Sequence, residues 1–264
     1  MSSRTALLTV DSRSIHLWCA FADEICDEEL LAQYETLLSQ DEQQRRSRFV
    51  FPRDQHRYLV TRALVRTVLS RYASVAPTEW TFAANAYGRP DIANDYARAR
   101  DISFNISHSG GLIVLGVAHR CAIGVDTENY RARQPSIEIA ERFFAPSEVA
   151  ALRALPTALQ PRRFFEYWTL KESYVKARAM GLSIPLDRFS VRFAGERHVA
   201  LSIDGDLGDS PSRWRLWQFS IAGDCLTAVC AERTGSDVPR LIVKKIVPLG
   251  EEHDLDARDL RTSV

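Results

Sequence analysis

The chain has 264 residues, of which 45% are hydrophobic and 26% are charged, and its formal net charge is zero because 34 basic side chains balance 34 acidic ones. This composition is typical of a globular protein and supplies enough apolar material for one large domain or two small ones. A general nucleic-acid-binding protein is expected to be basic, so the zero net charge argues against that class.

The five cysteines argue against a disulfide framework or a zinc site, because their number is odd and no pair has CxxC spacing. The first 17 residues are polar and mixed, without the apolar core of a signal peptide, and no stretch of the sequence approaches transmembrane length. We therefore expect a cytoplasmic protein with reduced thiols and no membrane partner.

Periodicity in the first part of the chain predicts strands followed by helices. The expected elements are strands at 7–10 and 15–19, helices at 23–41 and 54–72, and a turn at 85–90. Pro52 separates the two helices, and Asp54 is the expected N-cap of the second.

The second part begins with residues 107–111, which are expected to form a polar turn before an apolar strand at 112–118. Residues 119–121 are expected to close a hairpin onto 122–126. The later elements are helices at 137–154 and 161–179, then strands at 189–193, 199–203, 214–221 and 225–231. Residues 234–264 differ in composition and predict a tail that is ordered at 241–247 and frayed beyond.

Two carboxylates follow an apolar run near the middle of the chain. Asp126 and Glu128 stand at i and i+2 of a predicted strand, so both point to the face opposite Ile123 and Val125. Adjacent acids repel each other unless a cation or a proton intervenes. Magnesium uses one or two such carboxylates together with substrate phosphates. The alternative is an ordinary polar strand end that turns into a loop.

The predicted helix at 161–179 places Trp168, Glu172 and Lys176 at i, i+4 and i+8, on one face. A Glu–Lys pair at this spacing is usually a surface ion pair. Here the aromatic residues make the helix too apolar to lie at the surface, so its charged groups need buried partners. A metal ion and a phosphate would supply them, which favours phosphoryl chemistry.

Two further segments offer groups that bind anions. Ser107 and His108, followed by two glycines, supply hydroxyl, imidazole and backbone donors, although a simple surface turn is the alternative. Arg45 and Arg57 belong to an arginine cluster that could clamp a phosphate or form a solvated helix face. The sequence contains neither GxGxxG nor GxxxxGK[ST], so it does not support nucleotide binding by those loops.

Three blocks at 104–109, 123–128 and 168–176 resemble, in order and spacing, the signature blocks of the Sfp-type 4′-phosphopantetheinyl transferases. Flanking segments at 87–90, 142–144 and 181–186 agree. The resemblance extends from about residue 39 to about residue 231 and implies an α+β fold of two similar halves in pseudo-twofold arrangement. Each half would be a small antiparallel sheet packed with helices, with the active site between them. The implied division is 1–120, 121–233 and an extension at 234–264 without an assigned role.

The resemblance also implies a reaction. A monomeric, Mg²⁺-dependent enzyme would transfer the 4′-phosphopantetheine group of coenzyme A to a serine of an apo acyl, peptidyl or polyketide carrier protein, releasing 3′,5′-ADP. The implied metal ligands are Asp126, Glu128 and Glu172. The implied catalytic residues are Glu172 as the base, Glu128 as a possible partner in that role, and Lys176 on the phosphates. The implied coenzyme A contacts are Arg45, Arg57, Tyr87, Gly88, Arg89, Pro90, Ser107, His108 and Lys176.

Two positions depart from the family pattern: Arg89 and Glu42 stand where lysines occur in relatives. Carrier proteins are typically acidic with an apolar patch, so we expect a docking face that includes Arg131, Arg133 and the helix around 137–144. The pathway of the carrier, in fatty-acid or secondary metabolism, stays open. Two other functions compete: a metal-dependent phosphohydrolase, and a non-catalytic module that binds coenzyme A or a carrier.

Overall fold

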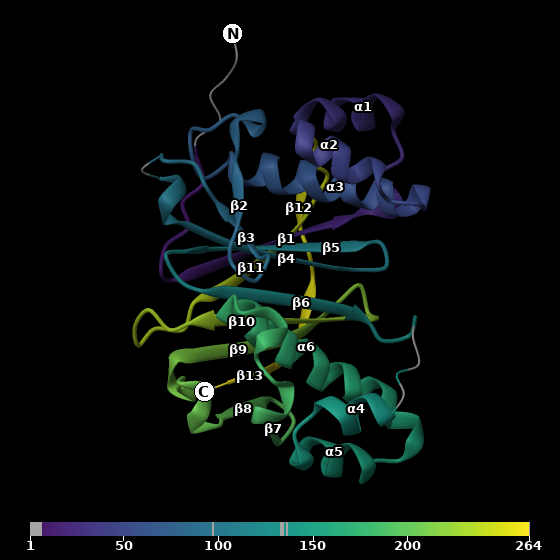
Figure 1. The fold of residues 1–264 in the computed structure, drawn as a ribbon, viewed down its shortest axis with the longest axis vertical. Helices are drawn as coiled ribbons and strands as arrows, with labels where there is room; N and C mark the ends of the chain where they lie inside the picture. The colour runs from purple at the N-terminus through teal and green to yellow at the C-terminus, as the bar shows by residue number, and fades with distance from the viewer. Residues whose placement is uncertain (1–6, 97, 133–134, 136, 264) are drawn as a thin grey trace.

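The computed structural model describes residues 7–96, 98–132, 135 and 137–263. The molecule is a stack of four layers: helices, a first sheet, a second sheet and helices again (Figure 1). Each half contributes one sheet and the helices on its outer face, with the long helices α3 (Pro52–Leu69) and α6 (Gln160–Arg178) against the two sheets. The predicted α+β class with two halves is confirmed.

The first half is built from β1 (Ser14–Phe21), α1 (Glu28–Leu37), α2 (Gln40–Ser47), α3 (Pro52–Leu69), β2 (Phe82–Ala84), β3 (Pro90–Ile92), β4 (Ile102–Ser109) and β5 (Leu112–His119). Short 3-10 helices are η1 (Ala22–Glu24), η2 (Pro77–Glu79) and η3 (Ala99–Asp101). The strand predicted at 7–10 is wrong, and the first strand runs from Ser14 to Phe21.

The helix boundaries in this half follow from local capping. The single helix predicted at 23–41 is divided because Leu38 is extended and Ser39 begins α2 with a capping box to Glu42. The prediction of Asp54 as N-cap is wrong: α3 begins two residues earlier, where Pro52 fits the first helical position and its missing N–H costs nothing.

The second half is built from β6 (Ile123–Asn129), α4 (Ile137–Phe143), α5 (Pro146–Arg153), α6 (Gln160–Arg178), β7 (Phe189–Ala194), β8 (His198–Ile203), β9 (Trp214–Ile221) and β10 (Cys225–Glu232). Its 3-10 helices are η4 (Thr157–Leu159), η5 (Gly181–Ser183), η6 (Leu186–Arg188), η7 (Gly205–Leu207) and η8 (Pro211–Arg213). The four predicted strands from β7 to β10 are confirmed. The helix predicted at 137–154 is split, because Ala145 is extended and Pro146 starts a new helix.

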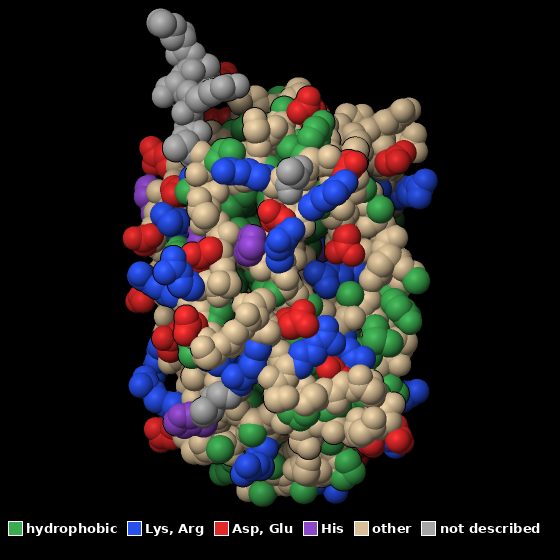
Figure 2. Space-filling model, turned by 90° about the vertical axis from the view of Figure 1, so that its left-hand side faces the viewer, with side chains coloured by type: hydrophobic (Ala, Val, Ile, Leu, Met, Phe, Trp, Pro, Cys, Tyr) green, Lys and Arg blue, Asp and Glu red, His purple; other side chains and the backbone are tan. Residues whose placement is uncertain are grey.

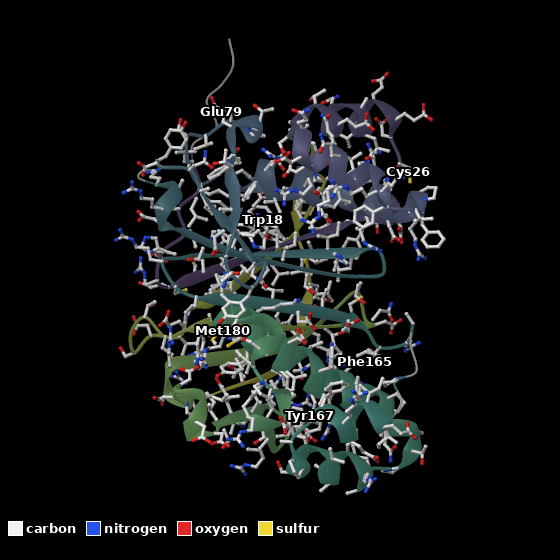
Figure 3. All side chains as sticks on the ribbon, in the orientation of Figure 1. Trp18, Cys26, Glu79, Phe165, Tyr167 and Met180 are labelled. Carbon is white, nitrogen blue, oxygen red and sulfur yellow. The ribbon has the colours of Figure 1, made fainter. Side chains whose placement is uncertain are left out.

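Strand alternation explains why the two sheets stack. In β1, Leu17 and Cys19 enter the core between the sheets, while Trp18 enters the core beneath α3. Figure 3 shows Trp18 in the first half, and Phe165 and Tyr167 in the second. Both faces of each sheet are thus covered, which accounts for the nearly continuous apolar run of β5.

The predicted hairpin between residues 112–118 and 122–126 is wrong. β5 pairs with β1 and β4 in the first sheet, whereas β6 pairs with β10 in the second. Arg120, in the left-handed region with φ 49°, lies in the link between the two sheets. Gly116 of β5 allows the two sheets to approach closely, because a Cβ at this position would lie 2.6 Å from Val125 Cγ2 of β6.

Three strands follow residue 239. β11 (Arg240–Ile246) lies parallel to β1, β12 (Glu252–Asp254) pairs with β11, and β13 (Ala257–Thr262) enters the second sheet between β9 and β8. The fraying predicted beyond 247 is wrong, because these residues find backbone partners in both sheets. Their parallel pairings also make both sheets mixed rather than purely antiparallel.

The surface carries charges of both signs (Figure 2), and the cysteine side chains are unpaired. On the face shown in Figure 2, basic and acidic side chains are interspersed rather than gathered into one field. All five cysteines are free, with Cys26 exposed at the edge of the first half (Figure 3). Within the described ranges, no helix combines the length and the apolar character needed to cross a bilayer.

Candidate active site

The site forms where β4 of the first sheet runs beside β6 of the second. Alternate side chains of β4 accept hydrogen bonds from backbone N–H groups of β6: Asn105 from Val125 at 2.8 Å, Ser107 from Thr127 at 3.3 Å and Ser109 from Asn129 at 3.1 Å. Because alternate residues of a strand share a face, the sequence Asn-x-Ser-x-Ser places acceptors along the edge of β6. The predicted turn at 107–111 is therefore wrong for residues 107–109, which are strand.

The same serine hydroxyls orient the two carboxylates of β6. Ser107 Oγ donates to Asp126 Oδ1 at 3.0 Å, and Ser109 Oγ donates to Glu128 Oε2 at 2.8 Å. The alternating residue Val125 enters the core between the sheets instead. The prediction that both acids leave β6 on the face opposite its apolar residues is confirmed.

α6 lies directly on β6 because Gly124 has no side chain. A Cβ at Gly124 would lie 2.0 Å from the Ser173 carbonyl oxygen and 2.4 Å from the Ala177 nitrogen. Both are backbone atoms of α6, so no side-chain movement could relieve such a contact. This close approach brings Glu172 and Lys176 of α6 over the carboxylates of β6.

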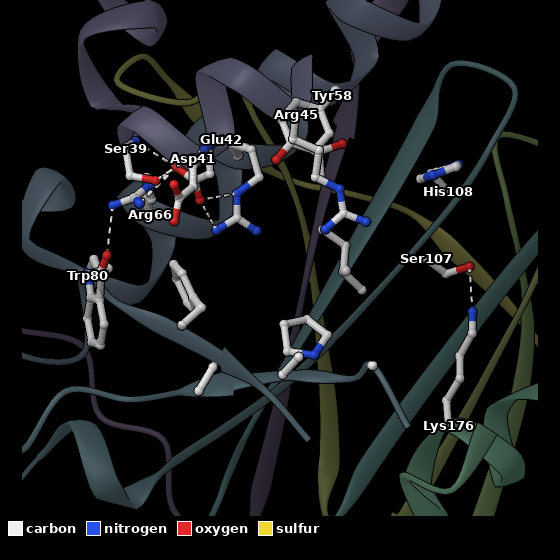
Figure 4. A pocket seen from close by; sticks show the side chains of 18 of the residues that line it. Ser39, Asp41, Glu42, Arg45, Tyr58, Arg66, Trp80, Ser107, His108 and Lys176 are labelled. Atoms are coloured by element: carbon white, nitrogen blue, oxygen red, sulfur yellow. Dashed lines mark hydrogen bonds and ion pairs between the residues drawn. The ribbon is translucent and has the colours of Figure 1, made fainter. Parts of the chain in front are cut away.

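Lys176 is held by three oxygen atoms of the facing strands. Its Nζ donates to Asp126 Oδ1 at 2.7 Å, to Ser107 Oγ at 3.0 Å and to the Val125 carbonyl at 3.1 Å. Figure 4 shows Lys176 and Ser107 at one end of the cleft. Asp126 Oδ2 is buried and has no hydrogen-bond partner in the described part of the chain. A buried carboxylate oxygen without a partner is unfavourable, and a cation would satisfy it.

Glu172 lies one helical turn before Lys176. Burial, followed by the charge of Asp126, raises the pKa of Glu172 to about 7, although Lys176 opposes the change; Glu128 contributes in the same direction as Asp126. Among the described residues, no three His, Cys, Asp or Glu side chains form a closed metal cage. The donors nevertheless fit Mg²⁺, which retains waters and takes one or two protein carboxylates beside substrate phosphates.

A second lysine of the same helix has a structural role. Lys171 Nζ is fully buried and donates to Glu148 Oε2 and to the Phe189 carbonyl, both at 2.7 Å. Glu148 also accepts from the backbone of Val191 and Ala145. Lys171 therefore fixes α6 to α5 and β7, on the side away from the carboxylates.

An open cleft of about 890 Å³ is lined by residues of both halves and reaches the carboxylates. Its far end holds Glu42, whose Oε1 and Oε2 accept from Arg62 at 2.6 Å and from Arg66 at 2.9 Å. The Arg62 guanidinium lies 4.7 Å from the centre of the Phe82 ring. Figure 4 shows Glu42, Arg66 and Trp80 at this end, and His108 and Lys176 at the other. Glu42 thus orients two arginines that line the cleft.

Most of the site residues predicted from the sequence line this cleft. They are Arg45, Gly88, Pro90, Ser107, His108, Asp126, Glu128, Glu172 and Lys176. Desolvation, and then the charges of Arg57 and Lys176, lower the pKa of His108, which disfavours the charged form of its ring. That these residues bind Mg²⁺ and coenzyme A remains a prediction.

Three predicted residues lie beside the lining rather than in it. Arg57 binds Asp54 at 2.8 Å, and Tyr87 is 53% exposed. Arg89 donates to the Lys176 carbonyl at 3.2 Å and to the Phe104 carbonyl at 3.0 Å, so it joins the two halves. The planar guanidinium group of Arg89 reaches both carbonyl groups through two nitrogen atoms, which the single ammonium group of the lysine found in relatives could not do in the same way.

Sequence reasoning missed Arg62, Arg66, Trp80 and Phe82, which line the far end of the cleft. Arg62 and Arg66 stand one turn apart in the largely apolar second half of α3, and that spacing is the signal that could have found them. Trp80 and Phe82 have no such pattern, because they follow an irregular segment.

Comparison with known proteins agrees with the geometry. The family model of the 4′-phosphopantetheinyl transferase superfamily matches residues 122–230, and the model of the 4′-phosphopantetheinyl transferase N-terminal region matches residues 26–120. The 4′-phosphopantetheinyl transferase HetI of Nostoc sp. is 35% identical over 228 residues, which cover 86% of this chain and 92% of HetI. The chain belongs to the 4′-phosphopantetheinyl transferase superfamily.

Other phosphopantetheinyl transferases are similarly related. The 4′-phosphopantetheinyl transferase Sfp of Bacillus subtilis is 32% identical over 211 residues, covering 80% of this chain and 89% of Sfp. A phosphopantetheinyl transferase of Thraustochytrium sp. is 31% identical over 230 residues, covering 81% of this chain and 78% of the relative. Residues 231–264 lie beyond the matches of both family models.

Proposed function

We propose that this phosphopantetheinyl transferase moves the 4′-phosphopantetheine group of coenzyme A to the serine of an apo carrier protein. One observation supports the proposal most directly: Asp126, Glu128, Glu172 and Lys176 come together at one end of the cleft that residues of both halves line. In-line phosphoryl transfer requires charge neutralisation and positioning more than covalent catalysis. Three carboxylates for a cation and a lysine for the phosphates meet that requirement.

The cleft offers a matching place for coenzyme A. Arg45, Ser107 and His108 line its walls and supply donors suited to phosphate oxygens. Gly88 and Pro90 border the same space, and the turn that contains them is tied to the end of α6 by Asn85, which donates to the Ala179 carbonyl at 2.8 Å. We assign Arg57, Tyr87 and Arg89 to the rim of this binding site.

Asp126, Glu128 and Glu172 would hold Mg²⁺. When bound, the ion would neutralise charge on the pyrophosphate of coenzyme A. Two observations agree with a cation site here: Asp126 Oδ2 is buried without a hydrogen-bond partner among the described residues, and burial together with the neighbouring carboxylates raises the pKa of Glu172. Mn²⁺ prefers similar oxygen donors, so the choice between the two ions is left to experiment.

Glu172 is the proposed base, with Glu128 as a possible partner. In the metal-free protein, burial raises the pKa of Glu172 to about 7, and a carboxylate whose proton affinity is raised in this way suits deprotonation of a serine hydroxyl. The serine oxygen would form a bond to phosphorus as the bond to 3′,5′-ADP breaks, and the serine proton would pass to the carboxylate. Lys176 would then stabilise the negative charge of the departing group.

We place the carrier on the exposed apolar surface of α4. Ile139 and Phe143 are 41% and 42% exposed, and Arg142 lies over the Phe143 ring at 5.3 Å. The next residue, Phe144, packs against Trp168, which lines the cleft, so α4 adjoins the cleft wall. Arg131 binds Asp224 at 2.8 Å, and Arg133 lies outside the described residues.

Replacing both Ile139 and Phe143 by Ser is expected to raise the KM for the carrier roughly 30-fold, because apolar anchors at an interface contribute on the order of 1 kcal/mol each and about 1.4 kcal/mol corresponds to a factor of ten. The KM for coenzyme A and the unfolding temperature should not change. Val238→Ser, at a 59% exposed site in the C-terminal extension, is the matched control. An unchanged carrier KM in the double variant would exclude this docking face.

The function itself is tested by mixing the purified protein with coenzyme A, Mg²⁺ and a panel of apo carriers, then weighing each intact carrier by mass spectrometry. A gain of one phosphopantetheine group that is lost on chelation of the metal is the expected result. Coenzyme A cleaved without a modified carrier would favour the phosphohydrolase. Coenzyme A bound but intact would favour a non-catalytic module. We further propose that the enzyme acts as a cytoplasmic monomer.

A further inference from the structure

The segment from residue 240 to residue 263 contributes strands to both sheets, although it lies beyond the residues that the two family models match. β11 pairs with β1 in the first sheet, and β13 pairs with β9 in the second (Figure 1, yellow). The first attachment is secured by Tyr34, whose hydroxyl donates to the Pro248 carbonyl at 2.7 Å, and by Glu252, which binds both Arg71 and Lys244. The segment is therefore fixed at both ends.

β13 occupies an interior position in the second sheet. Its neighbours are β9, along the whole strand, and β8, at the Thr262–His198 pair. Ser263 adds two contacts to Leu216, one from its N–H to the carbonyl and one from the Leu216 N–H to its hydroxyl, both at 2.9 Å. The β7–β8 hairpin thus joins the rest of its sheet through β13.

A bulge in β13 directs one arginine toward α6. The register with β9 shifts between Asp259 and Arg261, so Arg261 lies opposite Gln218 instead of Trp217. Residues opposite each other share a face of the sheet. Trp217 enters the apolar core between the sheets, whereas Gln218 faces α6, where its Nε2 donates to the Glu166 carbonyl and to Thr169 Oγ1. The bulge therefore moves Arg261 from the apolar core to the face that carries α6.

Arg261 connects this face to the helix through two partners. Its Nη1 donates to Gln218 Oε1 at 2.9 Å, and its Nη2 lies 3.3 Å from Glu166 Oε2. Glu166 is 4% exposed and also accepts from Arg163 at 2.7 Å. The Arg163 and Arg261 guanidinium groups each lie 4.5 Å from the centre of the Phe193 ring. Glu166 stands six residues before Glu172 in the same helix, so the anchor is rigidly linked to the proposed base.

We propose that Arg261 is a positioning residue, and that β13 braces α6 so that Glu172 and Lys176 are held against β6. The inference rests on the proposed function, because it assigns those two residues to the reaction. Arg261 does not line the cleft, and its partners are Glu166 and Gln218, so we assign its effect on the site to those two residues. A displacement of about 1 Å at a catalytic group can cost about 100-fold in rate, which sets the expected scale.

The test compares Arg261→Met, Arg261→Lys and the control Arg258→Met, at an exposed position of the same strand. In full-length Arg261→Met, kcat for carrier modification should fall roughly 10- to 100-fold, while the KM for coenzyme A stays within about twofold. Amide hydrogen exchange across residues 160–178, measured without substrates, should accelerate. Arg261→Lys should recover part of kcat, because an ammonium group keeps the charge beside Glu166 but cannot also reach Gln218 as a fork.

Several results would overturn the proposal. Wild-type kcat and wild-type exchange of α6 in Arg261→Met would do so, as would equal losses in Arg258→Met. A lowered unfolding temperature with unchanged kcat would reduce Arg261 to a structural contact. If Arg261→Met does not fold, Arg261→Lys decides, and wild-type exchange and kcat in that variant would reject the brace. If the wild-type enzyme modifies no carrier, the proposed function fails, but hydrogen exchange still tests the brace independently.

Discussion

Glu172→Gln is expected to lower kcat by about 100-fold or more, because general-base catalysis contributes roughly 100- to 10,000-fold and the amide cannot accept the serine proton. Binding of coenzyme A should largely survive, since the proposed binding residues lie mainly in the first half of the molecule. Intact-mass assays of the carrier measure the first quantity, and calorimetry measures the second. Turnover that remains at the wild-type level would transfer the role of base to another residue, with Glu128 the first candidate.

The same substitution should stabilise the metal-free protein at neutral pH. The pKa of Glu172 rises from 4.5 to about 7 on folding, so the folded protein keeps a proton that the unfolded chain has lost between these values. Stability of the wild type therefore falls as pH rises through this window, by about 3 kcal/mol at about 1.4 kcal/mol per pKa unit. The substituted amide does not titrate, so the variant should gain relative stability from about pH 4.5 upward and reach its full advantage above about pH 7.

Denaturant unfolding across this pH range, in the presence of a chelator, measures the difference. Glu29→Gln, at an exposed site in the first turn of α1, is the control for loss of one carboxylate. Added Mg²⁺ should stabilise the wild type above about pH 7 and have less effect on Glu172→Gln. A pH-independent difference between variant and wild type would show that Glu172 does not carry the raised pKa.

Gly124→Ala is expected to reduce kcat by about 100-fold and to destabilise the fold by roughly 1–3 kcal/mol. The new methyl group would overlap the Ser173 carbonyl and the Ala177 nitrogen, so α6 must move away from β6. Lys176 and Glu172 would then separate from Asp126. Steady-state kinetics and denaturant unfolding measure the two effects.

Gly205→Ala is the matched control for Gly124→Ala, because a Cβ at Gly205 meets nothing within 4 Å. It should retain wild-type kcat and stability within about 0.5 kcal/mol. The atoms nearest to the new methyl group at Gly124 are backbone atoms, so α6 must move to accommodate it. A Gly124→Ala enzyme with wild-type kinetics would therefore show that catalysis does not require the close contact between α6 and β6.

The separation between what could and could not be predicted is clearest at the carboxylates. Alternation along a strand fixes the common face of Asp126 and Glu128, and helical spacing fixes the common face of Trp168, Glu172 and Lys176. Both are local properties of the backbone, so the sequence predicts them and the structure confirms them. The distance between the two faces is not local, and it depends on the missing side chain of Gly124.

Errors in the sequence-based prediction have a related cause. Residues 107–109 have turn-like polar composition, yet they form a strand because they pair with β5, while Ser107 and Ser109 supply side-chain acceptors to the edge of β6. Residues 112–126 resemble a hairpin, yet β5 and β6 separate into two sheets because each strand finds its partners elsewhere in the chain. Local patterns carry no information about which distant strand completes a sheet.

The sequence by itself determined the family resemblance, the α+β class and the common faces of the candidate carboxylates and of Lys176, because these depend on residue identity and on the short-range periods of helices and strands. Only the tertiary structure decided that Arg62 and Arg66 join the cleft through Glu42, that Lys171 is a buried anchor, and that the last strands return to both sheets. Those outcomes depend on contacts between residues far apart in the chain. Such contacts are set by packing and by the pairing of buried polar groups, and no local pattern encodes them.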